Sequence, residues 1–270
     1  MTEVKESRRS GHPDDSAPDT RRLTAAEIFQ AALENARDEL RRSNQKLAFS
    51  GLAGGLTMGL TALSVACVRA MQSGGSNEQI VPYFIYPIGF IAVIIGRAQL
   101  FTENTLHPVI LVLDERRHVV RTLRLWGIVF ASNLVGALLF ALLAVKSPAL
   151  RPGIVAQLVQ LGENAAFGSG SHFFWSGVIG GWLIALVAWT VTASHWTIGQ
   201  LAIIYLLTFV VGVGHFAHCI AGSAEILSAV VAGSVPLPDY FRWLAPATGG
   251  NICGGVLMVS LLNYGQVKTI

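Results

Sequence analysis

The sequence predicts an all-α membrane protein with six transmembrane helices in two inverted three-helix repeats, of which the second and fifth helices are broken. Only 13% of the 270 residues are charged, whereas about 25% is usual in soluble domains. No Lys, Arg, Asp or Glu lies between Glu163 and Glu225. Two apolar segments, 79–113 and 198–232, are longer than one span of about 20 residues requires, and polar residues interrupt both near the middle.

The N-terminal part is polar and is expected to lie outside the membrane. Residues 1–23 are rich in Ser, Asp, Arg and Pro, which predicts a disordered cytoplasmic tail. Apolar residues at helical spacing over 24–46 predict an amphipathic helix, which begins at a capping box of Thr24 and Glu27. This helix is expected along the membrane or against the bundle, and a solvated cap helix fits the pattern equally well.

A six-helix pore domain is expected over 47–267. Its unbroken spans are predicted at 47–68, 125–145, 172–191 and 243–267, and residues 146–171 are expected to form a re-entrant or surface segment. Three spans in each half make the halves inverted repeats, and broken helices at equivalent positions point to a central transport path. Basic residues are more numerous near the span ends on the side of the termini, which places both termini in the cytoplasm.

The two interruptions carry the chemistry of the sequence. The first, residues 96–105, contains Arg97 and Glu103, and the second, residues 212–223, contains His215 and His218. Ionisable residues at membrane depth are costly unless they face a protein interior or a water-filled path. A loop at that depth also needs protein or a cavity to satisfy its backbone. Both interruptions are therefore candidates for the lining of a pore.

Other classes of function find no support in the sequence. It contains no nucleophile–base pair, nucleotide-binding loop or basic nucleic-acid patch, so we expect neither an enzyme nor a nucleic-acid partner. Cys67, Cys219 and Cys253 lack metal-ligand spacing. His215, His218 and Cys219 have no further ligand at helical spacing. We therefore expect no metal and no cofactor.

Three stretches resemble the formate/nitrite transporter family over about residues 47–265. The runs Leu100–Leu106, Phe216–Ala221 and Trp243–Gly255 are similar to that family's second, fifth and sixth helices. The resemblance implies an aquaporin-like protomer with its own pore, a homopentamer and a bacterial inner-membrane location. It also implies passage of small monovalent anions such as formate, nitrite or hydrosulfide, or of their conjugate acids, with proton coupling.

The resemblance also assigns roles to single residues. His218 matches a central histidine that exchanges a proton with the passing anion, and Thr102 matches its threonine partner. Phe90 and Phe101 match apolar constriction residues. The other candidates for the pore are Leu100, Asn104, His215, Arg97, Glu103 and Glu225.

Departures from the family pattern keep the substrate open. Ala217, Gly222, Gly181 and Ala165 stand where the family has a glutamate, two asparagines and a vestibule lysine. These losses would suit an aquaporin-like channel for a neutral solute, and a membrane scaffold or sensor is a further alternative.

Several of these residues could instead have purely structural roles. His218 could be a hydrogen-bonded packing residue, and His215 could serve the pore or the structure. Arg97, Glu103 and Glu225 could form a buried ion-pair network that joins the two breaks, or Arg97 could supply the positive field of the missing lysine.

Overall fold

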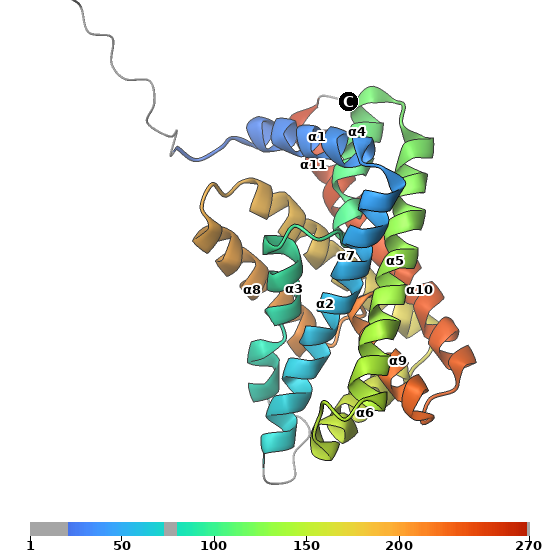
Figure 1. Cartoon of the computed structure of the whole chain (residues 1–270). Helices are drawn as coiled ribbons and strands as arrows, with labels where there is room; N and C mark the ends of the chain where they lie inside the picture. Colours follow the sequence, from blue (N-terminus) through green and yellow to red (C-terminus); the bar gives the residue numbers. More distant parts are fainter. Residues whose placement is uncertain (1–20, 73–79, 269–270) are drawn as a thin grey trace, which may run out of the picture.

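The computed structural model describes residues 21–72 and 80–268, which are helical without a strand. Figure 1 shows α1 lying across one end of a bundle of longer helices. The helices are α1 (Ala25–Arg41), α2 (Asn44–Met71), η1 (Val81–Ile85), α3 (Ile88–Ile95), η2 (Glu103–Thr105), α4 (His107–Glu115), α5 (Val119–Lys146), α6 (Pro152–Ala166), α7 (Gly170–Thr192), α8 (Thr197–Val213), α9 (Ala221–Ala232), α10 (Leu237–Gly255), η3 (Val256–Leu261) and α11 (Leu262–Val267).

Both predicted helix breaks are present. In the first overlong segment, α3 ends at Ile95 and α4 begins at His107, with the single turn η2 between them. In the second, α8 ends at Val213 and α9 begins at Ala221. Within the described residues, four helical stretches are long and apolar enough to cross a membrane, namely α2, α5, α7 and the continuous stretch Leu237–Val267. The broken segments supply shorter apolar helices.

The N-terminal helix packs against the bundle. The capping box is present, since the Thr24 hydroxyl accepts from the Glu27 N–H and the Glu27 carboxylate accepts from the Thr24 N–H. One face of α1, which includes Phe29 and Leu33, is fully buried and contacts α4, α7 and α11. The predicted boundary at residue 46 is shifted, because Ser43 caps α2 and that helix begins at Asn44. The tail predicted at 1–23 falls largely outside the described residues.

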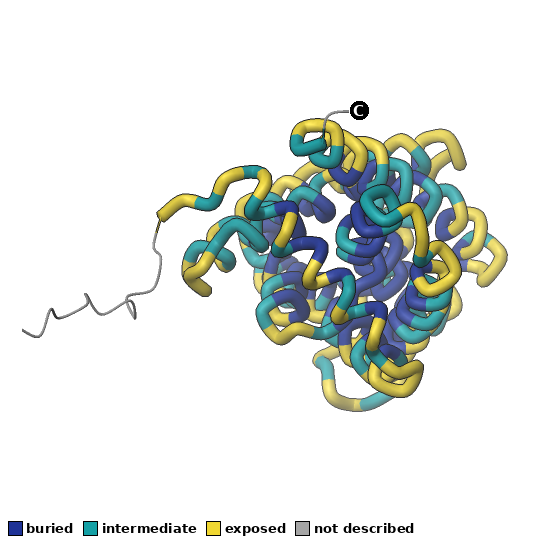
Figure 2. Tube along the Cα trace, turned by 90° about the horizontal axis from the view of Figure 1, so that it is seen from above, coloured by how far each residue is buried: buried dark blue, intermediate teal, exposed yellow. Residues whose placement is uncertain are grey.

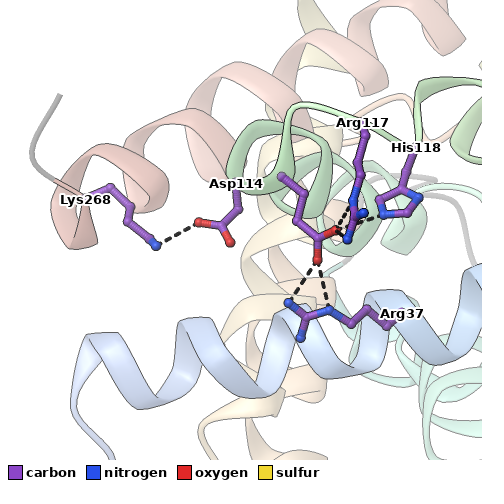
Figure 3. Close-up of polar contacts among 6 residues, drawn as sticks. Arg37, Asp114, Arg117, His118 and Lys268 are labelled. Carbon is purple, nitrogen blue, oxygen red and sulfur yellow. Dashed lines mark hydrogen bonds and ion pairs between the residues drawn. The ribbon is translucent and has the colours of Figure 1, made fainter.

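Ion pairs fasten both ends of the chain to α4. The Glu115 carboxylate binds Arg37 of α1 at 3.0 Å and His118 at 2.9 Å, and it also pairs with Arg117 (Figure 3). Lys268, which follows α11, pairs with Asp114 at 2.8 Å. Hydrogen bonds from His118 and Arg117 lower the pKa of Glu115 to about 2. The contribution of this carboxylate to stability is therefore complete above its ordinary pKa of 4.5 and is lost progressively as pH falls from there to about 2.

Two segments differ from the prediction. Residues 146–171, expected as a re-entrant or surface segment, contain the regular helix α6, which packs against α9 and α2. The last span starts at Leu237 and contains the π-helical turn η3. This turn places Ser260 so that its hydroxyl donates to the Thr105 carbonyl at 3.0 Å, beside the first break.

Burial is concentrated along the axis of the bundle. Seen from above, buried residues occupy the centre and exposed residues the rim (Figure 2). The rim includes large apolar side chains, among them Leu139, Leu142 and Leu143 of α5. Such a surface suits lipid or another subunit better than water.

Candidate functional site

An asparagine clamps each helix break. The Asn133 side chain of α5 accepts from the Phe101 N–H at 2.9 Å and donates to the carbonyls of Gln99, at 2.9 Å, and Gly51, at 2.7 Å. Asn133 is fully buried. Its side chain therefore supplies the hydrogen bonds that a non-helical loop at membrane depth requires.

The second break has the same clamp. The Asn251 side chain of α10 accepts from the Cys219 N–H and donates to the carbonyls of Ala217 and Gly177, each at 2.8 Å. The separation from the clamped carbonyl to the asparagine is 34 positions in both halves. The separation from the clamped N–H is 32 positions in both. The residue held between these groups is Leu100 in the first break and His218 in the second.

Both breaks begin with the same strained turn. Arg97 and His215 each follow a glycine and have left-handed backbones, with φ of 57° and 50°. The next N–H bonds back in the same way in both, from Ala98 to Val93 at 3.0 Å and from Phe216 to Val211 at 3.1 Å. A left-handed backbone costs a residue other than glycine about 1–2 kcal/mol. The Asn clamps and the adjoining helices keep both residues in this conformation.

His218 is almost completely buried beside the first break. Its Nε2 is 2.7 Å from the Thr102 hydroxyl of the other break. The Phe90 ring of α3 packs edge-on against its ring, with centroids 5.0 Å apart. His218 is 1% exposed, and Thr102 and Phe90 are fully buried. The predicted histidine–threonine pair is thus formed across the two breaks.

Hydrogen bonds define which nitrogen of His218 carries the proton. Nδ1 accepts from the Ala221 N–H at 3.0 Å, so in the neutral ring the proton lies on Nε2. The Nε2–H group then donates to the Thr102 oxygen, and the Thr102 hydroxyl keeps its own hydrogen for another acceptor. The histidine–threonine pair therefore presents a hydrogen-bond donor, the Thr102 hydroxyl, at this buried position.

A first cavity, of about 280 Å³, reaches His218 from the end of the bundle formed by α6. We call it the α6-side cavity. Its polar lining comes from α2, the η1 segment, α6, α7, α9 and the second break, and includes Arg69, Tyr83, Tyr86, Asn164, His172, Ser176, His215, His218 and Glu225. The Arg69 guanidinium donates to the Tyr83 hydroxyl at 2.5 Å. The Tyr83 ring contacts the edge of His215, with centroids 4.9 Å apart.

A second cavity, of about 540 Å³, lies toward α1, and we call it the α1-side cavity. Its charged and titratable lining consists of Asp38, Glu39, Arg42, Arg97, Glu103 and His107. Burial raises the pKa of Glu39, on α1, to about 7. Its carboxylate accepts from the Gln99 amide at 3.5 Å, and the Asn104 amide donates to Gln99 at 2.8 Å. These contacts join α1 to the first break.

The segment from η1 to Arg97 runs between the two cavities. Tyr83 lines the α6-side cavity, Arg97 lines the α1-side cavity, and Phe90 between them lines neither. Leu100 and Thr102 are also fully buried and line neither cavity. Phe90, which packs on His218, therefore forms a short apolar plug between the cavities, with His218 at its α6-side face.

Phe101, expected at the constriction, packs on α5. Its ring packs against Phe130 and Trp126 of α5, with centroids 4.8 and 5.8 Å away, and it lines neither cavity. The physical reason is the clamp, since Asn133 of α5 holds the Phe101 N–H and thus keeps this residue beside α5. Asn104 lines the α1-side cavity but also braces the loop, because its side chain donates to the Leu100 carbonyl at 3.0 Å.

The expected ion-pair network between the two breaks is not formed. Arg97 and Glu103 line the α1-side cavity, whereas Glu225 lines the α6-side cavity, and no ion pair joins any two of them among the described residues. Arg97 also lies in the opposite cavity from Ala165, so it does not take the place of the missing lysine. The arginine in the cavity of Ala165 is Arg69.

Packing explains two glycines that depart from the family pattern. A Cβ atom on Gly181 would lie 2.5 Å from the Asn251 Cα, so α7 and α10 could not approach as closely as they do. A Cβ atom on Gly222 would lie 2.5 Å from the Trp243 ring, which occupies that space. Side chains at both positions are thus excluded by the neighbouring helix.

Several residues that build the site are not marked as such by the sequence. Asn133 and Asn251 resemble ordinary polar residues of long helices, although their equal spacing from the two breaks is a usable signal. Arg69 stands out only as a charge at a span end, and Glu39 only as part of the N-terminal helix. His107, which contacts Thr192 at 3.4 Å in the α1-side cavity, has no motif to mark it.

Two cavities on opposite sides of a buried histidine and phenylalanine, within an apolar helical bundle, are typical of a membrane channel or transporter. The family description "Formate/nitrite transporter" matches residues 26–265. The protein therefore belongs to the formate/nitrite transporter family, whose members are channels or transporters and not enzymes.

Individual relatives agree with this assignment. The chain is 30% identical over 247 residues to "Inner membrane protein YfdC" of Escherichia coli (strain K12), covering 90% of this chain and 79% of that protein. It resembles the structure of an "FNT family ion channel" with a TM-score of 0.80 at 18% identity, covering 89% of this chain and 99% of that one. It also resembles a "Pentameric formate channel with formate bound", with a TM-score of 0.67 at 16% identity over 83% of this chain and 97% of that one.

Proposed function

We propose that the protein passes small monovalent anions of the formate or nitrite kind together with a proton, through the two cavities and past His218. The observation that carries the proposal is the pair of His218 and Thr102, which is buried between the cavities and presents a hydrogen-bond donor there. The similarity to a formate channel supports the choice of substrate class.

The apolar plug favours passage of the neutral acid. Phe90 and Leu100 offer no polar group to replace the water around an anion, and an uncompensated ion in such surroundings costs many kcal/mol. A protonated formate or nitrite has no net charge and loses far less. The anion therefore gains most from taking up a proton just before the plug and releasing it beyond.

His218 can supply that proton in two steps. Nδ1 first releases the Ala221 N–H and takes a proton from water in the α6-side cavity, which gives a cationic ring. Nε2 then transfers its proton to the anion, so the ring becomes neutral again with a proton on Nδ1. Thr102, whose hydroxyl is next to Nε2, donates a hydrogen bond to the same anion.

We also propose the finer architecture that the family resemblance implies. The matching clamps and strained turns support two inverted repeats, the first from α2 to α5 and the second from α7 to α11, which give six spans. The apolar rim and the pentameric neighbour support a homopentamer in a lipid bilayer. The inner-membrane relative and the basic residues near the termini support a bacterial inner membrane with both termini in the cytoplasm.

The test is to add formate or nitrite outside liposomes that contain the purified protein and a pH-sensitive dye. Wild-type protein should acidify the interior on addition of the anion, and His218→Gln should lower the rate about 10-fold or more, because glutamine cannot exchange a proton. The exposed His195 is the control, since His195→Gln makes the same change at a residue that lines neither cavity.

Two outcomes would contradict the proposal. An unchanged rate in His218→Gln would remove the histidine from the mechanism. Passage of a neutral solute by a wild-type protein that moves no anion would instead favour the aquaporin-like alternative, and passage of neither would favour a scaffold or sensor.

A further inference from the structure

Arg97 and His215 occupy equivalent places in the two breaks. Each is the residue after the glycine that ends the first half-helix, each has a left-handed backbone, and each precedes a clamped residue by the same short turn. Both are exposed, and Arg97 lines the α1-side cavity while His215 lines the α6-side cavity. Glycine would adopt this backbone without strain, so at both mouths a strained backbone accompanies a basic side chain.

We propose that Arg97 and His215 are the anion-receiving side chains of the two cavities, one permanently charged and the other titratable. This inference rests on the proposed function, and it adds an asymmetry to it. Anion binding from the α1 side uses a charge that does not depend on pH, because arginine stays protonated. Anion binding from the α6 side uses an imidazole, whose ordinary pKa of about 6.5 makes its charge depend on pH.

The surroundings of His215 allow its charge to matter. The charged and titratable groups that share the α6-side cavity are Arg69, Tyr83, Tyr86, His172, His218 and Glu225. Arg69 and Glu225 carry opposite formal charges, and the tyrosines are neutral near pH 7. Protonation of His215 then adds a positive charge at the mouth, on a residue more exposed than His218. His172 can add to the effect but lies at the start of α7, outside the breaks.

The equivalence of the two positions allows an exchange experiment. His215→Arg makes the α6-side group permanently charged, and Arg97→His makes the α1-side group titratable. Both variants keep a residue other than glycine at a left-handed position, so the backbone strain is similar. Both also leave His218 and Thr102 in place, so any pH dependence from proton transfer is common to all the proteins compared.

The measurement is the KM of formate uptake at pH 5.5 and pH 7.5, with equal pH on both sides, in right-side-out and in inverted membrane vesicles. The quantity compared is the KM at pH 7.5 divided by the KM at pH 5.5, for each vesicle orientation. A single imidazole with a pKa of about 6.5 changes its protonated fraction about tenfold over this range. His215→Arg should therefore lower the ratio about fivefold to tenfold in one orientation only.

The reciprocal variant should act in the other orientation. Arg97→His should raise the ratio there by a similar factor and leave the first orientation as in the wild type. If His215→Arg fails to assemble, His215→Asn serves, because asparagine tolerates the left-handed backbone and carries no charge. In His215→Asn, the KM values at pH 5.5 and at pH 7.5 should both stay near the wild-type value at pH 7.5, apart from the pH dependence that all the proteins share.

The outcomes separate this inference from the proposed function. If the wild-type protein takes up formate and neither exchange alters the ratio of KM values, the proposed roles of Arg97 and His215 are wrong. The proposed anion pathway is not affected by that result. An equal change in both orientations would also overturn the inference, because it would mean that neither residue serves one cavity. Absence of formate uptake by the wild-type protein would overturn the proposed function itself.

Discussion

Asn251→Leu is expected to destabilise the folded protein strongly in detergent or lipid. The substitution keeps the approximate size of the side chain but removes three hydrogen bonds of 2.8 Å, which leaves the Cys219 N–H and the carbonyls of Ala217 and Gly177 without this partner. Each unsatisfied buried group costs about 1–3 kcal/mol, so the three together cost about 3–9 kcal/mol. The measurement is thermal unfolding of the purified protein.

The matched control for this loss is Asn164→Leu. Asn164 lies on α6 and is exposed, so the same substitution there removes no buried clamp. We expect a fall in melting temperature on the order of 10 °C for Asn251→Leu and little change for Asn164→Leu. Equal melting temperatures for the two variants would show that the clamp does not support the second break.

Gly250→Ala is expected to be strongly destabilising, whereas Gly249→Ala, at the adjacent position of α10, is expected to be neutral or stabilising. A Cβ atom on Gly250 would lie 2.9 Å from the Gly177 Cα, within the contact between α7 and α10, and backbone atoms cannot turn aside. A Cβ atom on Gly249 would be 3.9 Å from the nearest atoms, which belong to the Phe174 ring.

The two substitutions share their effect on helix propensity, so their difference isolates packing. Alanine is favoured over glycine within a helix by about 0.5–1 kcal/mol, which Gly249→Ala should gain. Gly250→Ala should lose about 1–3 kcal/mol or more, because α7 and α10 must move apart. Parallel unfolding curves and the yield of assembled protein measure this difference. Gly250→Ala with the stability of Gly249→Ala would contradict the close approach of these helices.

The positions of the helix breaks could be predicted because ionisable residues are rare in the middle of an apolar run. Arg97, Glu103, His215 and His218 each mark a place where a continuous lipid-facing helix would bury an ionisable side chain. The contact between His218 and Thr102 followed from the family motif. The pattern of polar and apolar residues along the chain does not predict this contact, since 116 positions separate the two residues.

The side chains that hold the breaks could not be predicted by the same reasoning. Asn133 and Asn251 lie in the middle of long helices, and one asparagine does not interrupt a helical pattern. Their function depends on which carbonyls the neighbouring helices bring within 3 Å, and this is a property of packing. The direction of a loop side chain is likewise set by its partner helix, and the contact of Phe101 with α5 is an example that the motif alone does not give.

The assignment of charges to cavities also required the structure. Sequence distance suggested that Arg97 and Glu225 could pair across the breaks, since each belongs to or adjoins one of them. The two breaks enter the bundle from opposite ends, so their charged residues face different cavities. Arg69, in contrast, comes from α2 and reaches the α6-side cavity from a position that looked like an ordinary span end.

The central claim is that the anion crosses the plug beside Phe90 and His218 as a neutral acid. The most direct test records formate uptake and internal pH in the same proteoliposomes while a potassium diffusion potential is varied. One proton should accompany each formate, and the uptake rate should not change with voltage, because no net charge crosses the membrane. Formate uptake without a proton, at a rate that rises as the interior is made positive, would contradict the claim.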